Sequence, residues 1–221
     1  MKSEDHSNER PDKPVRTRRP RNSPEKTREQ LVQAAMELFQ QGGIIAVTTT
    51  SVTGAIGLTQ SGFYQHFSSV EECLQEAAQQ CGQRFRQFVV DHLRVAQSDS
   101  QNPLEAHVLH YRAVLQLCLD ERPLAELLLR RRNENSPIGR TMKQLHDSMR
   151  ADLLNNLKGI AASLYPGLQN DPRLLVLVDC LLAMSLAAGE MVLDSRGEVE
   201  TLASELAQYT YALCGNLVGR A

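Results

Sequence analysis

TTTSVTGAIGLTQSGFYQHF, residues 48–67, predicts two short helices joined by a glycine turn. Thr48 and Thr59 are residue types that cap helix N-termini, and they precede the predicted helices 49–55 and 60–66. Gly57 supplies the turn between them. This order is that of a helix-turn-helix, whose second helix enters the major groove of DNA. An ordinary pair of packed helices has the same outline, so the pattern alone leaves both interpretations open.

The rest of the 221-residue chain is predicted to be helical too, which makes the fold class all-α. Aromatic residues make up only 5% of the chain, and we find no strand-like alternation and no internal repeat. Ser23-Pro24-Glu25 predicts a helix that ends at Gly42-Gly43, and Ser68 or Ser69 caps a fourth helix that runs to about Val95. Further helices are predicted over 103–120, 123–133, 137–165, 172–193 and 198–219.

Positively charged residues are absent from the predicted helix-turn-helix and are concentrated upstream of it. From Glu29 to Gln83 there is no lysine or arginine, whereas residues 13–28 contain Lys13, Arg16, Arg18, Arg19, Arg21, Lys26 and Arg28. Cations matter because counterion release supplies most of the sequence-independent affinity for DNA. We therefore expect residues 1–22 to form a flexible basic arm that follows the backbone or enters an adjacent minor groove. The alternative is a tail that only aids solubility.

Residues 24–74 resemble the N-terminal domain of the TetR family of transcriptional regulators. The resemblance is carried by the core Gly57-Leu58-Thr59-x-x-x-x-Tyr64-x-x-Phe67. Other positions agree with it: Arg28, Leu31, Ala34, Ala35, Leu38, Phe39, Gly42, Gly43, Thr48, Thr49, Val52, Phe63, Glu71 and Leu74. Two positions depart from the family pattern. Val70 stands where the family has a lysine that contacts phosphate, and Thr53 stands where it has a small alanine that packs the two helices together.

The resemblance implies three parts: the arm 1–22, a helix-turn-helix domain 23–83, and a helical effector-binding and dimerisation domain 84–221. It also implies a homodimer that binds a palindromic operator in double-stranded DNA. Such a protein is usually a repressor, and a small apolar or anionic effector releases it from the operator. No cofactor is implied.

At positions that match the family motif, the resemblance assigns DNA contacts. Gln60 reads a base edge, since glutamine can bond adenine bidentately, and Thr49, Tyr64 and His66 contact phosphates. The alternatives are a solvent-facing Gln60 and a Tyr64 that belongs to the small core. The expected DNA-binding set is completed by Thr48, Thr50, Thr59, Ser61, Gly62, Arg16, Arg18, Arg19 and Arg21.

LLLRRRNENSPIGR, residues 127–140, places Arg130, Arg131 and Arg132 at the end of a leucine-rich helix. The helix dipole favours arginines there, and this structural explanation competes with binding the anionic head of a ligand. The same stretch, together with Val70, resembles the TetR-family repressors of unsaturated fatty-acid synthesis. That resemblance implies a fatty acyl thioester as a candidate effector.

The last two predicted helices are expected to form the dimer interface as a four-helix bundle with those of the partner. The residues assigned to it are Leu181, Leu182, Leu186, Leu202, Leu206, Tyr209 and Leu213. Residues 174–193 are apolar enough for a membrane span, but Asp179 and Glu190 interrupt them, and burial against a partner explains the composition without a membrane.

Catalytic and metal-binding functions find little support in the sequence. His107-x-x-His110 beside Glu105 is weak evidence for a metal, and no catalytic triad or phosphate loop is identifiable. Five scattered cysteines without a secretory segment predict reduced thiols in a cytoplasmic protein. Two alternatives to a DNA-binding regulator remain: an adaptor whose helix-turn-helix has decayed, favoured by the missing cations, and an enzyme that uses a leucine-lined cavity.

Overall fold

A computed structural model describes residues 23–99, 102–164 and 168–218 of the chain. Every regular element in these ranges is a helix, which confirms the all-α prediction. The elements are α1 (Pro24–Ala46), α2 (Thr49–Ile56), α3 (Gln60–Phe63), α4 (Val70–Asp99), α5 (Pro103–Asp120), α6 (Arg122–Arg131), α7 (Pro137–Leu164), the 3₁₀ turn η1 (Leu168–Asn170), α8 (Arg173–Leu193) and α9 (Val199–Val218). The predicted arm and the Pro166-Gly167 break lie outside the described residues.

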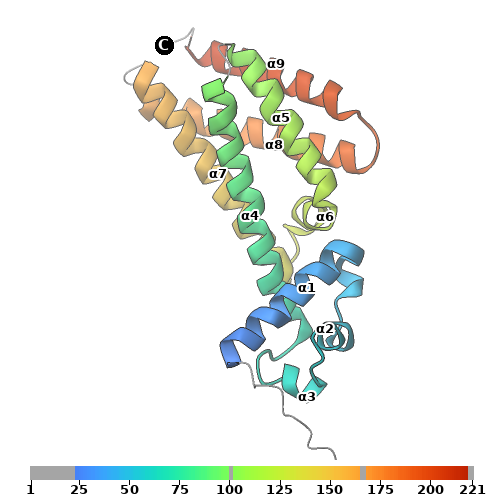
Figure 1. Cartoon of the computed structure of the whole chain (residues 1–221). Coiled ribbons are helices and arrows are strands. Elements are labelled where there is room, and N and C mark those ends of the chain that lie inside the picture. The colour runs from blue at the N-terminus through green and yellow to red at the C-terminus, as the bar shows by residue number, and fades with distance from the viewer. Residues whose placement is uncertain (1–22, 100–101, 165–167, 219–221) are drawn as a thin grey trace, which may run out of the picture.

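Helices α1 to α3 form a small head at one end of the molecule, and α5, α7, α8 and α9 form a larger body (Figure 1). The long helix α4 runs from the head into the body, and α6 lies at the junction. One hydrophobic core continues across this junction. It joins Phe39 of α1 and Phe63 of α3 to Leu128 of α6 and Met142 of α7. The head is therefore packed onto the body rather than tethered to it.

The helix ends in the head follow the predicted caps. Ser23 accepts a hydrogen bond from Lys26 N, and Thr48 Oγ1 accepts one from Ser51 N at 3.0 Å. Gly43 (φ 68°, ψ −164°) breaks α1, and Gly57 (φ 68°, ψ 31°) ends α2 in the left-handed conformation. Glycine adopts these angles without the steric cost that a Cβ would add.

Helix α3 is shorter than predicted, because residues 64–66 form a turn instead of continuing the helix. The backbone tightens here: His66 N donates to Phe63 O, and Gln65 N donates to Gly62 O. This turn brings Phe67 back beside Phe63, with ring centroids 5.6 Å apart, and both rings are buried. Burial of the two rings thus sets the end of α3.

Helix α4 begins as predicted but runs further, to Asp99 instead of about Val95. Ser69 Oγ accepts a hydrogen bond from Glu72 N, while the Glu72 carboxylate accepts from Ser68 N and Oγ. Both serines therefore take part in the cap. Val70, which stands in place of the family's lysine, packs against the core of the head.

Candidate DNA-binding surface and internal cavity

The helix-turn-helix rests on a few fully buried side chains. Val52 of α2 and Phe63 of α3 are inaccessible to solvent. Thr53, which replaces the family's alanine, is also buried, and its hydroxyl donates to Thr49 O at 2.7 Å. A buried hydroxyl is costly only when it lacks a partner. The departure at Thr53 is therefore absorbed within α2.

Polar side chains cover the outer surface of this pair of helices. Thr50, Gln60 and Ser61 are exposed, and Tyr64 is 58% exposed while its ring packs edge-on against Phe63. The amide of Gln60 donates a hydrogen bond to Thr50 Oγ1 at 3.1 Å, which links α3 to α2. Thr49 and His66 are partly exposed beside them. The structure thus brings Gln60 and Thr50 into direct contact, and the other four residues lie in α2, α3 and the turn after α3.

Three members of the expected DNA-binding set also support the backbone of the motif. Thr48 caps α2 through Ser51, and Thr59 Oγ1 accepts from Gly62 N at 3.2 Å. A Cβ added to Gly62 would lie 2.9 Å from Leu58 Cγ, so a larger residue here would force the Leu58 side chain to move. Thr48, Thr59 and Gly62 thus set the shape of the surface.

Arg28 has its guanidinium engaged inside the head. It forms an ion pair with Glu76 at 2.7 Å, donates to His66 O and lies 4.0 Å from the centroid of the Phe67 ring. These contacts clamp α1 to the turn after α3 and to α4. Arg28 therefore has a structural role, although the sequence groups it with the basic residues of the arm.

The N-terminal end of α2 supplies positive potential without a charged side chain. Its first turn consists of Thr49, Thr50 and Ser51, whereas α1 begins with Glu25 and α4 with Glu71 and Glu72. Helix N-termini attract anions through free backbone N–H groups and the helix dipole, and nearby carboxylates reduce that attraction. Arg16, Arg18, Arg19 and Arg21 lie outside the described residues.

Comparison with known proteins identifies the head. Residues 31–77 match the profile of a sequence family described as "Bacterial regulatory proteins, tetR family". This is a TetR-family DNA-binding domain. A search of curated proteins gives no match. The head thus carries the family's motif together with the exposed polar surface described above.

Solved structures show that the fold of the whole chain is also that of TetR-family regulators. A protein assigned to this family from Mesorhizobium loti is 13% identical with a TM-score of 0.69, and the match covers 87% of this chain and 98% of that one. A TetR-like transcriptional regulator from Rhodococcus is 18% identical (TM-score 0.57; 88% and 97% covered). The fatty acid degradation regulator FadR from Bacillus halodurans is 17% identical (TM-score 0.58; 82% and 96% covered). At these identities the likeness concerns the fold.

The body of the chain contains a cavity of about 120 Å³ between α4, α5, α7 and α8. Most of its wall is apolar, formed by Val89, Val90, Leu93, Val114, Met149, Leu153, Leu181 and Leu182. Its polar residues are Arg86, His110, Tyr111, Asp152, Asn156 and Ser185. None of these polar residues is among the expected ligand contacts. They come from four helices, so no local motif marks them, and only the apolar spacing around His110 hints at an inward-facing position.

Charged groups at the cavity are paired with each other. Arg86 donates to both carboxylate oxygens of Asp152, at 2.5 and 2.7 Å. Tyr111 Oη and Thr210 Oγ1 lie 2.7 Å apart, and Ser185 Oγ donates to Leu181 O. Among the described residues, Nδ1 of His110 has no hydrogen-bond partner. Burial lowers the pKa of His110 to about 3, helped by nearby His92 and His107, so its ring is neutral at neutral pH.

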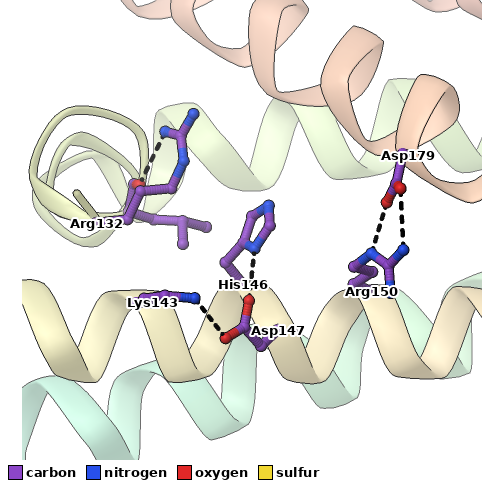
Figure 2. Close-up of polar contacts among 7 residues, drawn as sticks. Arg132, Lys143, His146, Asp147, Arg150 and Asp179 are labelled. Carbon is purple, nitrogen blue, oxygen red and sulfur yellow. Dashed lines mark hydrogen bonds and ion pairs between the residues drawn. The ribbon is translucent and has the colours of Figure 1, made fainter.

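The three arginines at the end of α6 lie away from this cavity and have partners of their own. Arg130 pairs with Asp194 at 2.6 Å, and Arg131 pairs with Glu134 at 2.9 Å. Arg132 turns back to donate to the carbonyls of Leu128 and Leu129. Figure 2 shows the Arg132 side chain with one dashed hydrogen bond. The Arg132 contacts fit the structural explanation, in which an arginine side chain bonds the last carbonyls of a helix, and carboxylates occupy Arg130 and Arg131.

The predicted dimer residues divide into two groups. Leu181 and Leu206 are only 3% and 5% exposed and belong to the core of the chain itself, as does the nearly buried Leu182. Leu186, Leu202 and Leu213 are half-buried, and Tyr209 is exposed. Leu181, Leu182 and Leu206 point inward because α8 and α9 pack on α7 and α5 within the chain. The outward row of α8 consists of Val176, Cys180, Ala183 and Ala187.

A shallow groove of about 390 Å³ lies beside this outward row. Ala183, Leu186 and Ala187 of α8 form one side, and Arg132 and His146 lie across from them. Figure 2 shows the polar groups of this region: Lys143 and His146 both contact Asp147, and Arg150 pairs with Asp179 of α8. The groove is thus bordered by paired charges and has an apolar side.

Other candidate chemistries gain no support. In the described ranges, no group of three or more His, Cys, Asp or Glu residues is placed to hold a metal. Burial raises the pKa of Cys73 and of Cys118 to about 12, which keeps both thiols unreactive. Helix α8 is long and apolar enough to cross a membrane, and 39% of its most apolar window is buried in the chain. A core helix of a folded domain passes the same test.

Proposed function

We propose that the chain is a cytoplasmic, sequence-specific repressor that binds a palindromic operator as a homodimer and is released by a small molecule. The observation that carries this proposal is the surface of the TetR-family domain. There Thr50, Gln60 and Ser61 are exposed over buried Val52 and Phe63. A decayed motif would not need to keep both the polar outer surface and the caps at Thr48 and Thr59.

In this proposal, the residues that bind the phosphate backbone differ from the residue that recognises the bases. Gln60 reads a base edge, because its Oε1 and its second amide N–H stay free when the first N–H bonds Thr50. Thr49, Tyr64 and His66 donate to phosphates, and the N-terminus of α2 adds its dipole. The charged contacts come from Arg16, Arg18, Arg19 and Arg21 of the arm.

The outward row of α8 is the proposed centre of the dimer interface. Val176, Cys180, Ala183 and Ala187 form a narrow apolar row at i, i+4, i+7 and i+11, which suits close helix packing. The shallow groove continues this row toward Leu186 and Arg132. Exposed Tyr209 and half-buried Leu213 of α9 lie at the side of the bundle that two such helix pairs would form.

Release by a ligand would act through α4. This helix starts directly after the turn that follows α3, and its residues Arg86, Val89, Val90 and Leu93 line the cavity. Arg28 also clamps the head to α4 through Glu76. A ligand that favours one position of α4 would therefore bias the spacing of the two reading helices in a dimer.

A fatty acyl thioester remains one candidate effector, and the likeness to FadR from Bacillus halodurans is its support. The arginines expected to meet its anionic head are, however, already paired with acids or carbonyls. The cavity is also far smaller than the roughly 300–1,000 Å³ of pockets for drug-sized ligands. A smaller effector therefore fits the structure better.

The proposal is tested by mixing the full chain with sheared DNA from its host and sequencing the retained fragments. A shared palindrome supports the repressor. Retained fragments without any shared site would mean that only the basic arm binds DNA, without sequence preference. That result would favour the adaptor. Each fragment is then challenged with candidate effectors, and release from the shared site supports ligand control.

A further inference from the structure

The internal cavity keeps its charges paired, and one buried imidazole on its wall has a nitrogen without a partner. Arg86 and Asp152 satisfy each other through two hydrogen bonds, and their side chains are 41% and 24% exposed. His110 is 8% exposed, and its Nδ1 lacks a hydrogen-bond partner among the described residues. The ion pair thus lies nearer the solvent, and the unpaired imidazole lies deeper in an apolar wall.

We propose that the effector is an uncharged molecule of about one ring that carries a hydroxyl group, such as a simple phenol, with the hydroxyl bonded to His110. This inference rests on the regulator function proposed above and adds the chemical class of the ligand. It concerns binding alone, and the ligand leaves unchanged.

The volume of the cavity suits a ligand of about one ring. Its volume is about 120 Å³. An engineered apolar cavity of about 150 Å³ takes up benzene, so a ring of that size with one small substituent is near the limit here. A long acyl chain would need many more contacts than these walls provide.

The charges of the cavity select against an anion. The guanidinium of Arg86 is already held by Asp152, so a carboxylate would enter beside a paired cation and next to an acidic side chain. Burial of an ion without a free partner is strongly unfavourable.

The unpartnered Nδ1 of His110 has less than 1 Å² of accessible surface, so it selects for a hydroxyl once the ring turns toward the cavity. A neutral histidine has one donor and one acceptor nitrogen, and a hydroxyl can serve as either partner. A ring without a hydroxyl leaves the buried nitrogen unpaired, which costs affinity. His92, whose ring centroid lies 6.0 Å from that of His110, has an unpartnered buried Nδ1 too, but it does not line the cavity.

The test is isothermal titration calorimetry on the full-length protein without DNA, with phenol, toluene and benzoate as probes. We expect phenol to bind, toluene to bind about tenfold more weakly, and benzoate to bind no better than toluene. In His110→Phe, which keeps a ring of similar size, the advantage of phenol over toluene should fall to within about twofold. Arg130→Gln, which lies outside the cavity, should keep the wild-type ratio.

The wild-type protein alone can overturn the proposal, even if the variant does not fold. Equal binding of phenol and toluene, tighter binding of benzoate than of phenol, or no binding of phenol would each contradict it. Palmitoyl-CoA that binds in place of phenol would also contradict it, in favour of the acyl thioester. A shared operator recovered without phenol binding would refute the ligand class and leave the regulator standing. Phenol binding without a shared operator would support the ligand class and refute the regulator function.

Discussion

Gln60 and Thr50 are joined by a hydrogen bond of 3.1 Å from the Gln60 side-chain amide to Thr50 Oγ1. The bond links the first residue of α3 to the first turn of α2. It holds an exposed, flexible side chain in one direction before any DNA arrives. A base contact made by a side chain already held in place loses less conformational entropy on binding.

Gln60→Ala is predicted to relax sequence choice more than it weakens overall binding. Loss of a bidentate base contact should reduce discrimination between the operator and a base-substituted operator by about 1–3 kcal/mol. Thr50→Val removes only the hydrogen bond that Thr50 accepts from Gln60. It should reduce the discrimination between the two operators by a smaller amount. Fluorescence anisotropy on matched and mismatched duplexes measures both. Gln79→Ala, on the exposed side of α4, is the control and should change neither affinity.

Neutralising the arm is predicted to weaken binding to all sequences alike. Each lost phosphate contact should make the slope of log K against log salt shallower by about 0.9. The variant replaces Arg16, Arg18, Arg19 and Arg21 together by glutamine. The control is Arg94→Gln, whose side chain pairs with Asp91 in the body. An unchanged slope in the arm variant would show that the arm does not hold DNA.

Arg28→Ala is predicted to lower stability without altering the salt slope. It removes the ion pair with Glu76, the bond to His66 O and the contact with the Phe67 ring. Together these should cost about 1–3 kcal/mol in the free energy of unfolding, measured in urea. Arg28→Lys should recover only part, because lysine lacks the planar fork. A salt slope that becomes shallower in Arg28→Ala, with stability unchanged, would instead place Arg28 on the DNA.

Ala187→Glu is predicted to produce monomers that bind the operator poorly. The substitution places a charge in the outward apolar row of α8 while the core of the chain stays intact, since Ala187 is exposed. Sedimentation velocity measures the oligomeric state. Gln116→Glu, on the exposed side of α5, adds the same charge elsewhere and should leave the dimer unchanged. If the Ala187→Glu protein still sediments as a dimer, the dimer interface does not include this row.

His110 is predicted to make the protein less stable in mild acid. Burial, and secondarily His92 and His107, lower its pKa from 6.5 to about 3. Tyr111 packs against its ring, and Arg86 and Asp152 lie at the same cavity as a neutral pair. Because the folded pKa is the lower one, the unfolded chain takes up the proton first. The stability from this group is therefore complete above about pH 6.5 and is lost as the pH falls toward 3.

Between pH 7 and pH 5 this group alone should lower the free energy of unfolding by about 2 kcal/mol. Urea titrations across that range measure the loss. His110→Phe keeps all other titrating groups, so its stability should fall by about 2 kcal/mol less over the same range. Parallel curves for the two proteins would mean that His110 titrates normally.

The sequence predicts the head in detail because its signals are local. Thr48, Gly57 and Thr59 each act within three or four residues, and the structure confirms all three as caps or turns. The prediction placed the end of α3 three residues too late, at His66 instead of Phe63. Burial of Phe63 and Phe67 outweighs continuation of the helix there. The partners of Arg28 also escaped prediction, since Glu76 lies 48 positions away.

The sequence suggested a leucine-lined cavity, but its polar residues could not be predicted because they meet only after four helices pack. His110 attracted attention in the sequence as one of two histidines three apart, a spacing that raised a metal site. Its neighbours His92 and Tyr111 show a different role, an uncharged ring against an apolar wall. Leu181 and Leu206 illustrate a related difficulty. An apolar helix shows that burial occurs, but not whether the chain itself or a partner provides it.

The most direct measurement is the sequencing of host DNA fragments retained by the full-length protein, with Gln60→Ala in parallel. We predict that the wild-type protein recovers one short palindrome near promoters, and that Gln60→Ala recovers a degenerate version of it. Recovery of fragments without a shared site, identical for both proteins, would contradict the claim that this surface reads DNA.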